Sequence, residues 1–81
     1  MSAGGLALKK RSLSIAGHRT SVSLEEAFWT ALKALAARRG LSVAALVGEI
    51  DAGRGDANLS CALRVAILTD ALARAEAPPS A

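Results

Sequence analysis

Two short stretches near the start of the chain alternate between apolar and polar residues. They are residues 11–16 (RSLSIA) and 19–24 (RTSVSL). Because successive side chains of a strand point to opposite faces, this alternation predicts two half-buried strands. Gly17 lies between them and is compatible with a tight hairpin turn or with a kink in one long strand. The more apolar faces of the two stretches carry Leu13, Ile15, Thr20, Val22 and Leu24.

Three later segments carry apolar residues at the spacing of an α-helix. They cover about residues 24–39, 43–51 and 59–76. Each has an apolar stripe that a helix would turn toward a core. The first segment begins with a capping-box pattern, in which Ser23 is the N-cap and Glu26 bonds back to the N-cap backbone. The chain is therefore predicted to be mainly α-helical, with strands at its N-terminal end.

The predicted helices are separated by typical helix-ending sequences. Residues 40–42 (GLS) combine a glycine, which suits the position after a helix, with Ser42, a good N-cap for the next helix. Residues 52–58 (AGRGDAN) form a loop because they contain two glycines together with Asp and Asn. Either Asn58 or Ser60 is expected to cap the third helix.

The chain is so short and so apolar that a monomer is expected to be only marginally stable. It has 81 residues, of which 52% are hydrophobic, and chains of this size bury a small share of their surface. Its single cysteine, Cys61, excludes an internal disulfide and is expected to be a small buried hydrophobe. Trp29, beside the apolar stripe of the first helix, is expected in the core. The third helix is apolar nearly all round, which indicates burial against a partner chain, so we expect a homodimer.

Positive charge is concentrated near the N-terminus. Residues 1–24 hold four basic residues and no acid, whereas residues 25–81 hold six basic and seven acidic residues, which accounts for the net charge of +3. Such a basic arm either attracts phosphate or serves only as a solvated tail. We expect residues 1–9 to be a disordered arm, residues 10–77 a single domain and residues 78–81 a disordered tail.

The sequence offers little for catalysis or for metal binding. Nucleophilic catalysis needs a base close to the nucleophile, and the only histidine, His18, has no carboxylate near it in sequence. One histidine and one cysteine make no metal-binding pattern, so we expect no metal, no cofactor and no enzyme activity. No apolar run approaches the roughly 18–20 residues of a membrane span, and no signal peptide is evident, so the expected location is the cytoplasm, without a membrane partner.

The order of the predicted elements resembles a known family. Residues 18–50 (HRTSVSLEEAFWTALKALAARRGLSVAALVGEI) are similar to the ribbon-helix-helix (Arc/MetJ-like) superfamily, with an alternating strand that leads into a helix and a GLS turn before the next. With NLSCALRV from Asn58 onward, the pattern is similar to a bacterial branch of that superfamily. The resemblance implies a mainly α fold with an N-terminal β-ribbon, assembled as an intertwined homodimer and extended by a C-terminal helix.

The resemblance also implies a function, that of a sequence-specific DNA-binding transcriptional regulator. In that family, two chains pair their strands, and the ribbon enters the major groove of double-stranded DNA. The strand residues that would contact bases are Arg19, Ser21 and Ser23. The residues that would contact phosphate are Ser42 and the backbone of Val43, with Lys9, Lys10 and Arg11 adding attraction. Each assignment has a plainer alternative, since Arg19 also suits a solvated strand and Ser42 a simple N-cap, and Ser23 is occupied if it caps the first helix.

The stretch at residues 11–16 departs from the simplest members of the family. If it folds back on residues 19–24, a dimer would carry a four-stranded sheet, nearly 10 Å wider than a two-stranded ribbon and too wide for the major groove. The chain would then be a dimeric protein-interaction module, antitoxin-like or an adaptor, that binds a partner protein and does not read DNA through its ribbon. If it stays a free arm, it follows the phosphate backbone instead.

Overall fold

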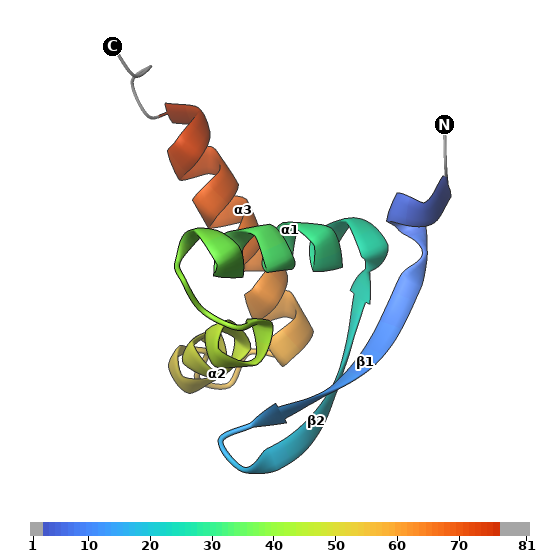
Figure 1. Ribbon diagram of the computed structural model, residues 1–81, viewed down its shortest axis with the longest axis vertical. Coiled ribbons are helices and arrows are strands. Elements are labelled where there is room, and N and C mark those ends of the chain that lie inside the picture. The colour runs from blue at the N-terminus through green and yellow to red at the C-terminus, as the bar shows by residue number, and fades with distance from the viewer. Residues whose placement is uncertain (1–2, 77–81) are drawn as a thin grey trace.

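The computed structural model describes residues 3–76 as one hairpin packed against three helices (Figure 1). A short 3-10 helix, η1, leads into the hairpin. The elements are η1 (Ala3–Leu6), β1 (Leu8–Ile15), β2 (His18–Glu25), α1 (Glu26–Arg38), α2 (Val43–Gly53) and α3 (Leu59–Glu76). The predicted order of strands followed by three helices is confirmed, and the ribbon is built from two strands of one chain.

A two-residue turn at Ala16 and Gly17 joins β1 to β2. The strands are antiparallel, with Ile15 opposite His18 next to the turn and Leu8 opposite Glu25 at the far end. Ala16 and Gly17 have φ values of 51° and 83°. Two consecutive positive φ values are what a tight hairpin turn needs to match the twist of its strands. Of the two conformations open to Gly17, the chain therefore adopts the hairpin turn.

The prediction of a disordered arm over residues 1–9 is wrong for residues 3–9, which form η1 and the first part of β1. A long-range hydrogen bond holds this segment, because the backbone N–H of Glu26 donates to the carbonyl of Ala7 over 2.8 Å. Pairing of β1 with β2 holds the residues that follow. The tail predicted at residues 78–81 lies outside the described residues.

The prediction that Ser23 caps the first helix is also wrong. Ser23 belongs to β2 and lies opposite Lys10, and the N-cap position is taken by Glu25, which makes no side-chain capping bond. The strand pairing keeps residues 23–25 extended, so α1 starts two residues later than the local sequence suggests. The carbonyl of Ala7 accepts one of the free N–H groups of its first turn.

The other two helix starts follow the sequence. The Ser42 hydroxyl accepts a hydrogen bond from the N–H of Ala45 over 3.0 Å and so caps α2. The side-chain oxygen of Asn58 accepts one from the N–H of Cys61 over 3.3 Å, which settles the choice between Asn58 and Ser60. α2 runs to Gly53, two residues beyond the expected end.

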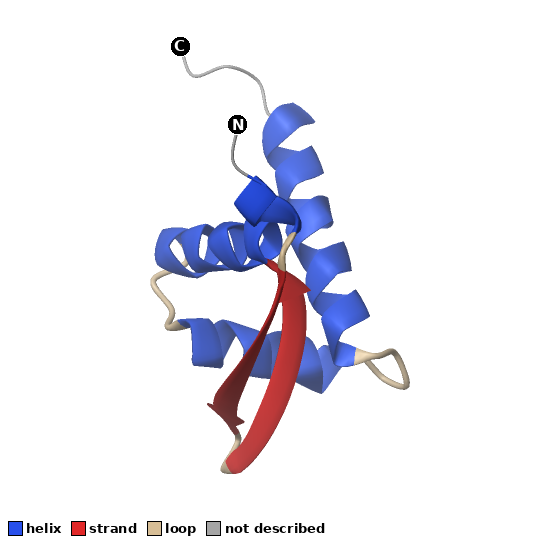
Figure 2. Ribbon diagram, turned by 90° about the vertical axis from the view of Figure 1, so that its right-hand side faces the viewer, coloured by secondary structure: helices blue, strands red, loops and turns tan. Residues whose placement is uncertain are grey.

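The core lies between one face of the hairpin and the three helices, as Figure 2 shows by looking onto the hairpin with the helices behind it. Trp29 is buried, as predicted, and its Nε1–H donates to the carbonyl of Lys9 over 2.8 Å. This bond ties β1 to α1. The buried residues are Ile15, Val22, Leu24, Trp29, Leu32, Leu35, Ala36, Leu46, Val47, Leu63 and Ile67.

α3 packs on the rest of the chain through one side only. Leu63 and Ile67 are buried against the rest of the chain, whereas Cys61 is exposed, contrary to the prediction that it is a buried hydrophobe. Cys61 lies two residues before Leu63, and a two-residue step turns a helix by more than half a turn, so the two side chains leave α3 on nearly opposite sides.

Candidate nucleic-acid interface

The face of the hairpin that points away from the helices is lined by serines and two cations. Directly opposite residues of an antiparallel pair share a face, and the register pairs Lys10 with Ser23, Ser12 with Ser21 and Ser14 with Arg19. Their neighbours in β2, Val22 and Leu24, are buried on the opposite face. We call these six residues the outer hairpin face: Lys10, Ser12, Ser14, Arg19, Ser21 and Ser23.

The two cations of the outer hairpin face lie at its diagonal corners. Lys10 is on β1 in the row with Ser23, and Arg19 is on β2 in the row with Ser14, four residues along the strands. At about 3.3 Å per residue, the two rows are about 13 Å apart. Serine hydroxyls line the space between them. All six side chains are exposed except that of Ser23, which is half-buried.

Lys9, Lys10 and Arg11 do not form one cluster, because alternate residues of β1 point to opposite faces. Lys10 joins Arg19 on the outer hairpin face, whereas Lys9 and Arg11 lie opposite the buried Leu24 and Val22. The guanidinium of Arg11 sits over the Trp29 ring, 5.3 Å from its centroid. Sequence reasoning placed Arg19, Ser21 and Ser23 on one face but missed that Lys10, Ser12 and Ser14 share it. The alternation of residues 11–16, combined with a two-residue turn at residues 16 and 17, would have predicted this shared face.

The cations of the hairpin have no acidic partner, unlike the arginines in the rest of the described chain. Within residues 3–76, no ion pair involves a cation of the hairpin, whose basic residues are Lys9, Lys10, Arg11 and Arg19. Five arginines elsewhere are each paired with a carboxylate. They are Arg38, Arg39, Arg54, Arg64 and Arg74. The net positive field therefore comes mainly from the hairpin.

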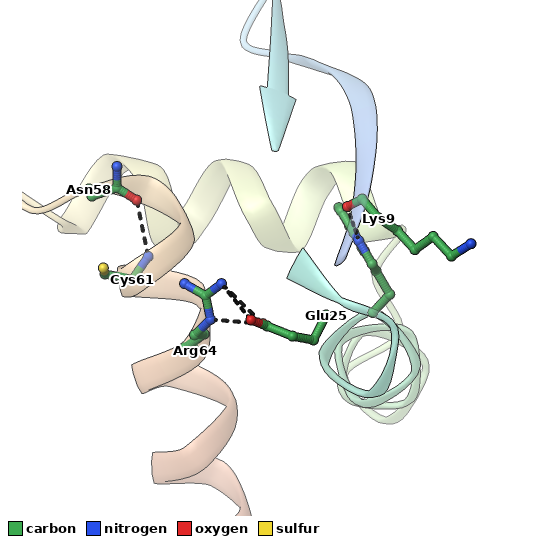
Figure 3. Close-up of polar contacts among 6 residues, drawn as sticks. Lys9, Glu25, Asn58, Cys61 and Arg64 are labelled. Atoms are coloured by element: carbon green, nitrogen blue, oxygen red, sulfur yellow. Dashed lines mark hydrogen bonds and ion pairs between the residues drawn. The ribbon is translucent and has the colours of Figure 1, made fainter. Parts of the chain in front are cut away.

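One ion pair fixes the base of the hairpin to α3 (Figure 3). Arg64 donates from Nε and Nη2 to the two carboxylate oxygens of Glu25, at 3.1 and 3.3 Å. The backbone N–H of Glu25 and then these arginine bonds hold the pKa of Glu25 below its usual range. Glu25 is the acid at the end of β2, and its charge is neutralised by this pairing, so it does not oppose the field of Lys10 and Arg19.

The predicted phosphate residues Ser42 and Val43 lie at the start of α2, apart from the hairpin in sequence. Ser42 is exposed, and its hydroxyl caps the helix, while Val43 is half-buried against the core. The capping bond satisfies the N–H of Ala45, and the N–H of Leu46 donates to the carbonyl of Ser42. The N–H groups that come before Ala45 in the first turn have no acceptor within the helix, and such groups can bind an anion.

The described part of the chain holds no other obvious chemistry. Among residues 3–76, no three side chains of His, Cys, Asp or Glu come together in a way that would hold a metal ion. Across the same residues, no helix is long and apolar enough to cross a membrane.

Comparison with known proteins agrees with this architecture. The family model described as a ribbon-helix-helix domain matches residues 8–71, so the chain belongs to the ribbon-helix-helix family. The match spans both strands and most of α3.

The chain is also similar to a solved structure, that of an uncharacterized protein from Bordetella pertussis Tohama I. The two share 36% sequence identity and superpose with a TM-score of 0.80, over 94% of this chain and 65% of that one. The chain thus spans about two thirds of the length of its structural relative. No curated protein matches it.

Proposed function

We propose that this protein is a sequence-specific DNA-binding transcriptional regulator that reads the major groove with the outer hairpin face of each subunit. Members of the ribbon-helix-helix family are typically DNA-binding transcription regulators or antitoxins. The single observation that carries the proposal is the outer hairpin face itself. It is polar, it carries the unpaired cations Lys10 and Arg19, and it belongs to a ribbon only two strands wide.

The width of the ribbon decides how it meets DNA. Two strands are about 4.8 Å apart, and with side chains they fit a major groove about 12 Å wide. A four-stranded sheet made from two hairpins would place its outer strands roughly 14 Å apart, which is too wide for the same groove. Residues 11–16 do fold back on residues 19–24, which is the condition under which we expected a protein-interaction module. That expectation depends on two hairpins that pair edge to edge into a four-stranded sheet. The present proposal is instead that a single hairpin enters each groove, in place of the ribbon of two chains that the family resemblance led us to expect.

Each predicted site residue has a role in this arrangement. Arg19 donates two hydrogen bonds to the edge of a guanine, and Ser21 and Ser23 donate to or accept from neighbouring bases. Lys10 was expected from the sequence to contact phosphate, but it shares the outer hairpin face with Arg19, about 13 Å along the ribbon, and is proposed to contact a second base. Ser42 and the backbone of Val43 bind a phosphate at the start of α2, while Lys9 and Arg11, exposed on the other face of β1, add long-range attraction to the DNA backbone.

The regulator is proposed to act as a homodimer, as members of the family generally do. A second candidate function, a dimeric protein-interaction module, is favoured by a different observation. α3 exposes three large apolar side chains on the side away from the core: Val65, Leu68 and Leu72. A protein that bound partners only through this surface would not need the outer hairpin face.

The test is binding to mixed-sequence duplex DNA at two salt concentrations, measured by fluorescence anisotropy. We expect affinity to fall steeply as salt rises, because several phosphate contacts release counterions. Arg19→Gln should weaken binding strongly. Lys33→Gln is the matched control, since it removes the same charge from an exposed position on α1, outside the hairpin, and should have little effect.

Two results would contradict the proposal. Absence of binding even at low salt would leave the outer hairpin face without a role on DNA and favour the protein-interaction module. Equal weakening by Arg19→Gln and Lys33→Gln would mean that DNA responds only to overall charge and not to this face.

A further inference from the structure

Glu25 is the one acidic residue among residues 8–25, and it lies next to the outer hairpin face. It follows Ser23 by two positions in β2, so both side chains leave the strand on the same side. The register pairs Ser23 with Lys10, which makes Lys10 and Glu25 diagonal neighbours across the hairpin. Such neighbours are about 7–8 Å apart, within reach of long side chains. A free carboxylate at Glu25 can therefore reach the ammonium group of Lys10.

In the folded chain, Glu25 is turned toward α3 and not toward Lys10. Figure 3 shows the guanidinium of Arg64 facing the Glu25 carboxylate, with hydrogen bonds of 3.1 and 3.3 Å from Nε and Nη2. Within residues 3–76, Glu25 forms its ion pair with Arg64 and none with Lys10. Arg64 thus occupies the carboxylate that would otherwise neutralise a cation of the outer hairpin face.

Arg64 is itself held in one orientation. Its guanidinium lies over the ring of Phe28 in α1, 5.8 Å from the centroid, and its side chain is 33% exposed. The residue before it, Leu63, is fully buried, which anchors this turn of α3. A planar guanidinium that stacks on a ring and donates twice to one carboxylate is a specific arrangement, which lysine or glutamine would not reproduce.

An acid freed at position 25 would oppose DNA binding in two ways. It would lie about 7 Å along the strand from Ser23, a proposed base contact, and would repel the phosphates. It would also compete with DNA for Lys10. Both effects are electrostatic, and neither requires Arg64 to touch DNA.

We propose that Arg64 is a positioning residue for DNA binding, which keeps Glu25 turned toward α3 and so leaves Lys10 free for DNA. This inference rests on the proposed function, and the contacts that it uses all lie within one chain. It gives α3 a part in DNA binding, although no residue of that helix belongs to the outer hairpin face.

Binding to duplex DNA at low salt, measured by fluorescence anisotropy, tests the inference. Arg64→Gln should lower the affinity by roughly tenfold, on the scale of one uncompensated charge close to DNA at a protein surface. Arg74→Gln is the matched control, because it removes the same charge from the same helix and breaks an ion pair with Asp70. We expect this control to bind almost as well as the wild type.

A change at Glu25 separates positioning from a merely structural role of the ion pair. Glu25→Gln breaks the same pair but removes the acid, so the affinity should equal that of the wild type or exceed it. The double variant Arg64→Gln with Glu25→Gln should regain most of the affinity lost in Arg64→Gln. The defect of Arg64→Gln should also shrink as salt rises, since salt screens exposed charges. A structural role predicts weak binding in both single variants and no recovery in the double variant.

Circular dichroism shows whether each variant is folded. A folded Arg64→Gln that binds like the wild type overturns the inference, and so does a double variant that stays as weak as Arg64→Gln. Weakened binding by Glu25→Gln overturns it as well, even if Arg64→Gln does not fold. A wild type that fails to bind DNA overturns the proposed function and this inference with it, so the wild type alone distinguishes the two failures.

Discussion

The outer hairpin face and the outward side of α3 are both surfaces that remain exposed after the same core has formed, yet they differ in kind. The hairpin face is polar and carries cations without acidic partners, whereas the outward side of α3 exposes Val65, Leu68 and Leu72, and the arginines of that helix are paired. The first suits a polyanion and the second suits an apolar surface. A chain of 81 residues thus separates two surface chemistries by placing them on different elements of one core.

The largest expected effect removes the core that both surfaces share. Leu63→Ala truncates a fully buried side chain and should lower the free energy of unfolding by about 2–5 kcal/mol. Leu72→Ala truncates an exposed leucine on the same helix and should change it by about 0.5 kcal/mol or less. Urea denaturation at a concentration where the chain is monomeric measures both. Equal losses would mean that the two sides of α3 are not as different as their exposure indicates.

A change at the turn should affect the hairpin and spare α3. Gly17→Val places a β-branched residue at φ 83° and should cost about 1–3 kcal/mol through backbone strain, since no atom lies within 4 Å of the position of the new Cβ. Ala16→Asn is the control, because Asn tolerates positive φ and Asn-Gly is a preferred pair for this turn, so stability should stay equal or rise. Urea denaturation measures both variants, and equal stability of Gly17→Val and Ala16→Asn would mean that the turn does not depend on positive φ.

The smallest expected effect concerns the contact that joins the two regions, the ion pair between Glu25 and Arg64. The pKa of Glu25 is lowered in the folded chain by its own backbone N–H and by Arg64. The stabilisation is therefore fully present above the ordinary pKa of a glutamate and is lost as pH falls through the lowered value. Melting temperature measured from neutral to acidic pH should show this loss, and Glu25→Gln should reduce it. An unchanged pH profile in Glu25→Gln would assign the loss to another carboxylate, such as Asp70, whose pKa is lowered mainly by a hydrogen bond from Arg74.

Sequence reasoning succeeded where structure depends on neighbours along the chain. The spacing of apolar residues located three helices, and Ser42 caps α2 as expected because an N-cap involves residues only three apart. It failed at Ser23, where the same kind of local pattern was overruled by pairing with Lys10 across the hairpin. The glycine-rich start was misjudged for a similar reason, since the bond from Glu26 to Ala7 spans nineteen positions.

The candidate site shows the same division. Parity within one strand placed Arg19, Ser21 and Ser23 on one face, but only the register of the hairpin brings Lys10 to that face and turns Lys9 and Arg11 away from it. On α3, apolar residues occur nearly all round, so periodicity could not tell which stripe the subunit covers. That choice depends on how α1 and α2 lie against the helix, which no local pattern specifies.

The two-residue turn at Ala16 and Gly17 also constrains how this protein can diversify. Adding or deleting one residue in either strand would exchange its two faces, sending side chains such as Val22 into water and serines into the core. The ligand preference can therefore change by substitution at the six positions of the outer hairpin face. Insertions and deletions in the strands would instead disrupt the core. In related chains, we expect the segment from Leu8 to Glu25 to vary in amino-acid sequence but to keep a constant length.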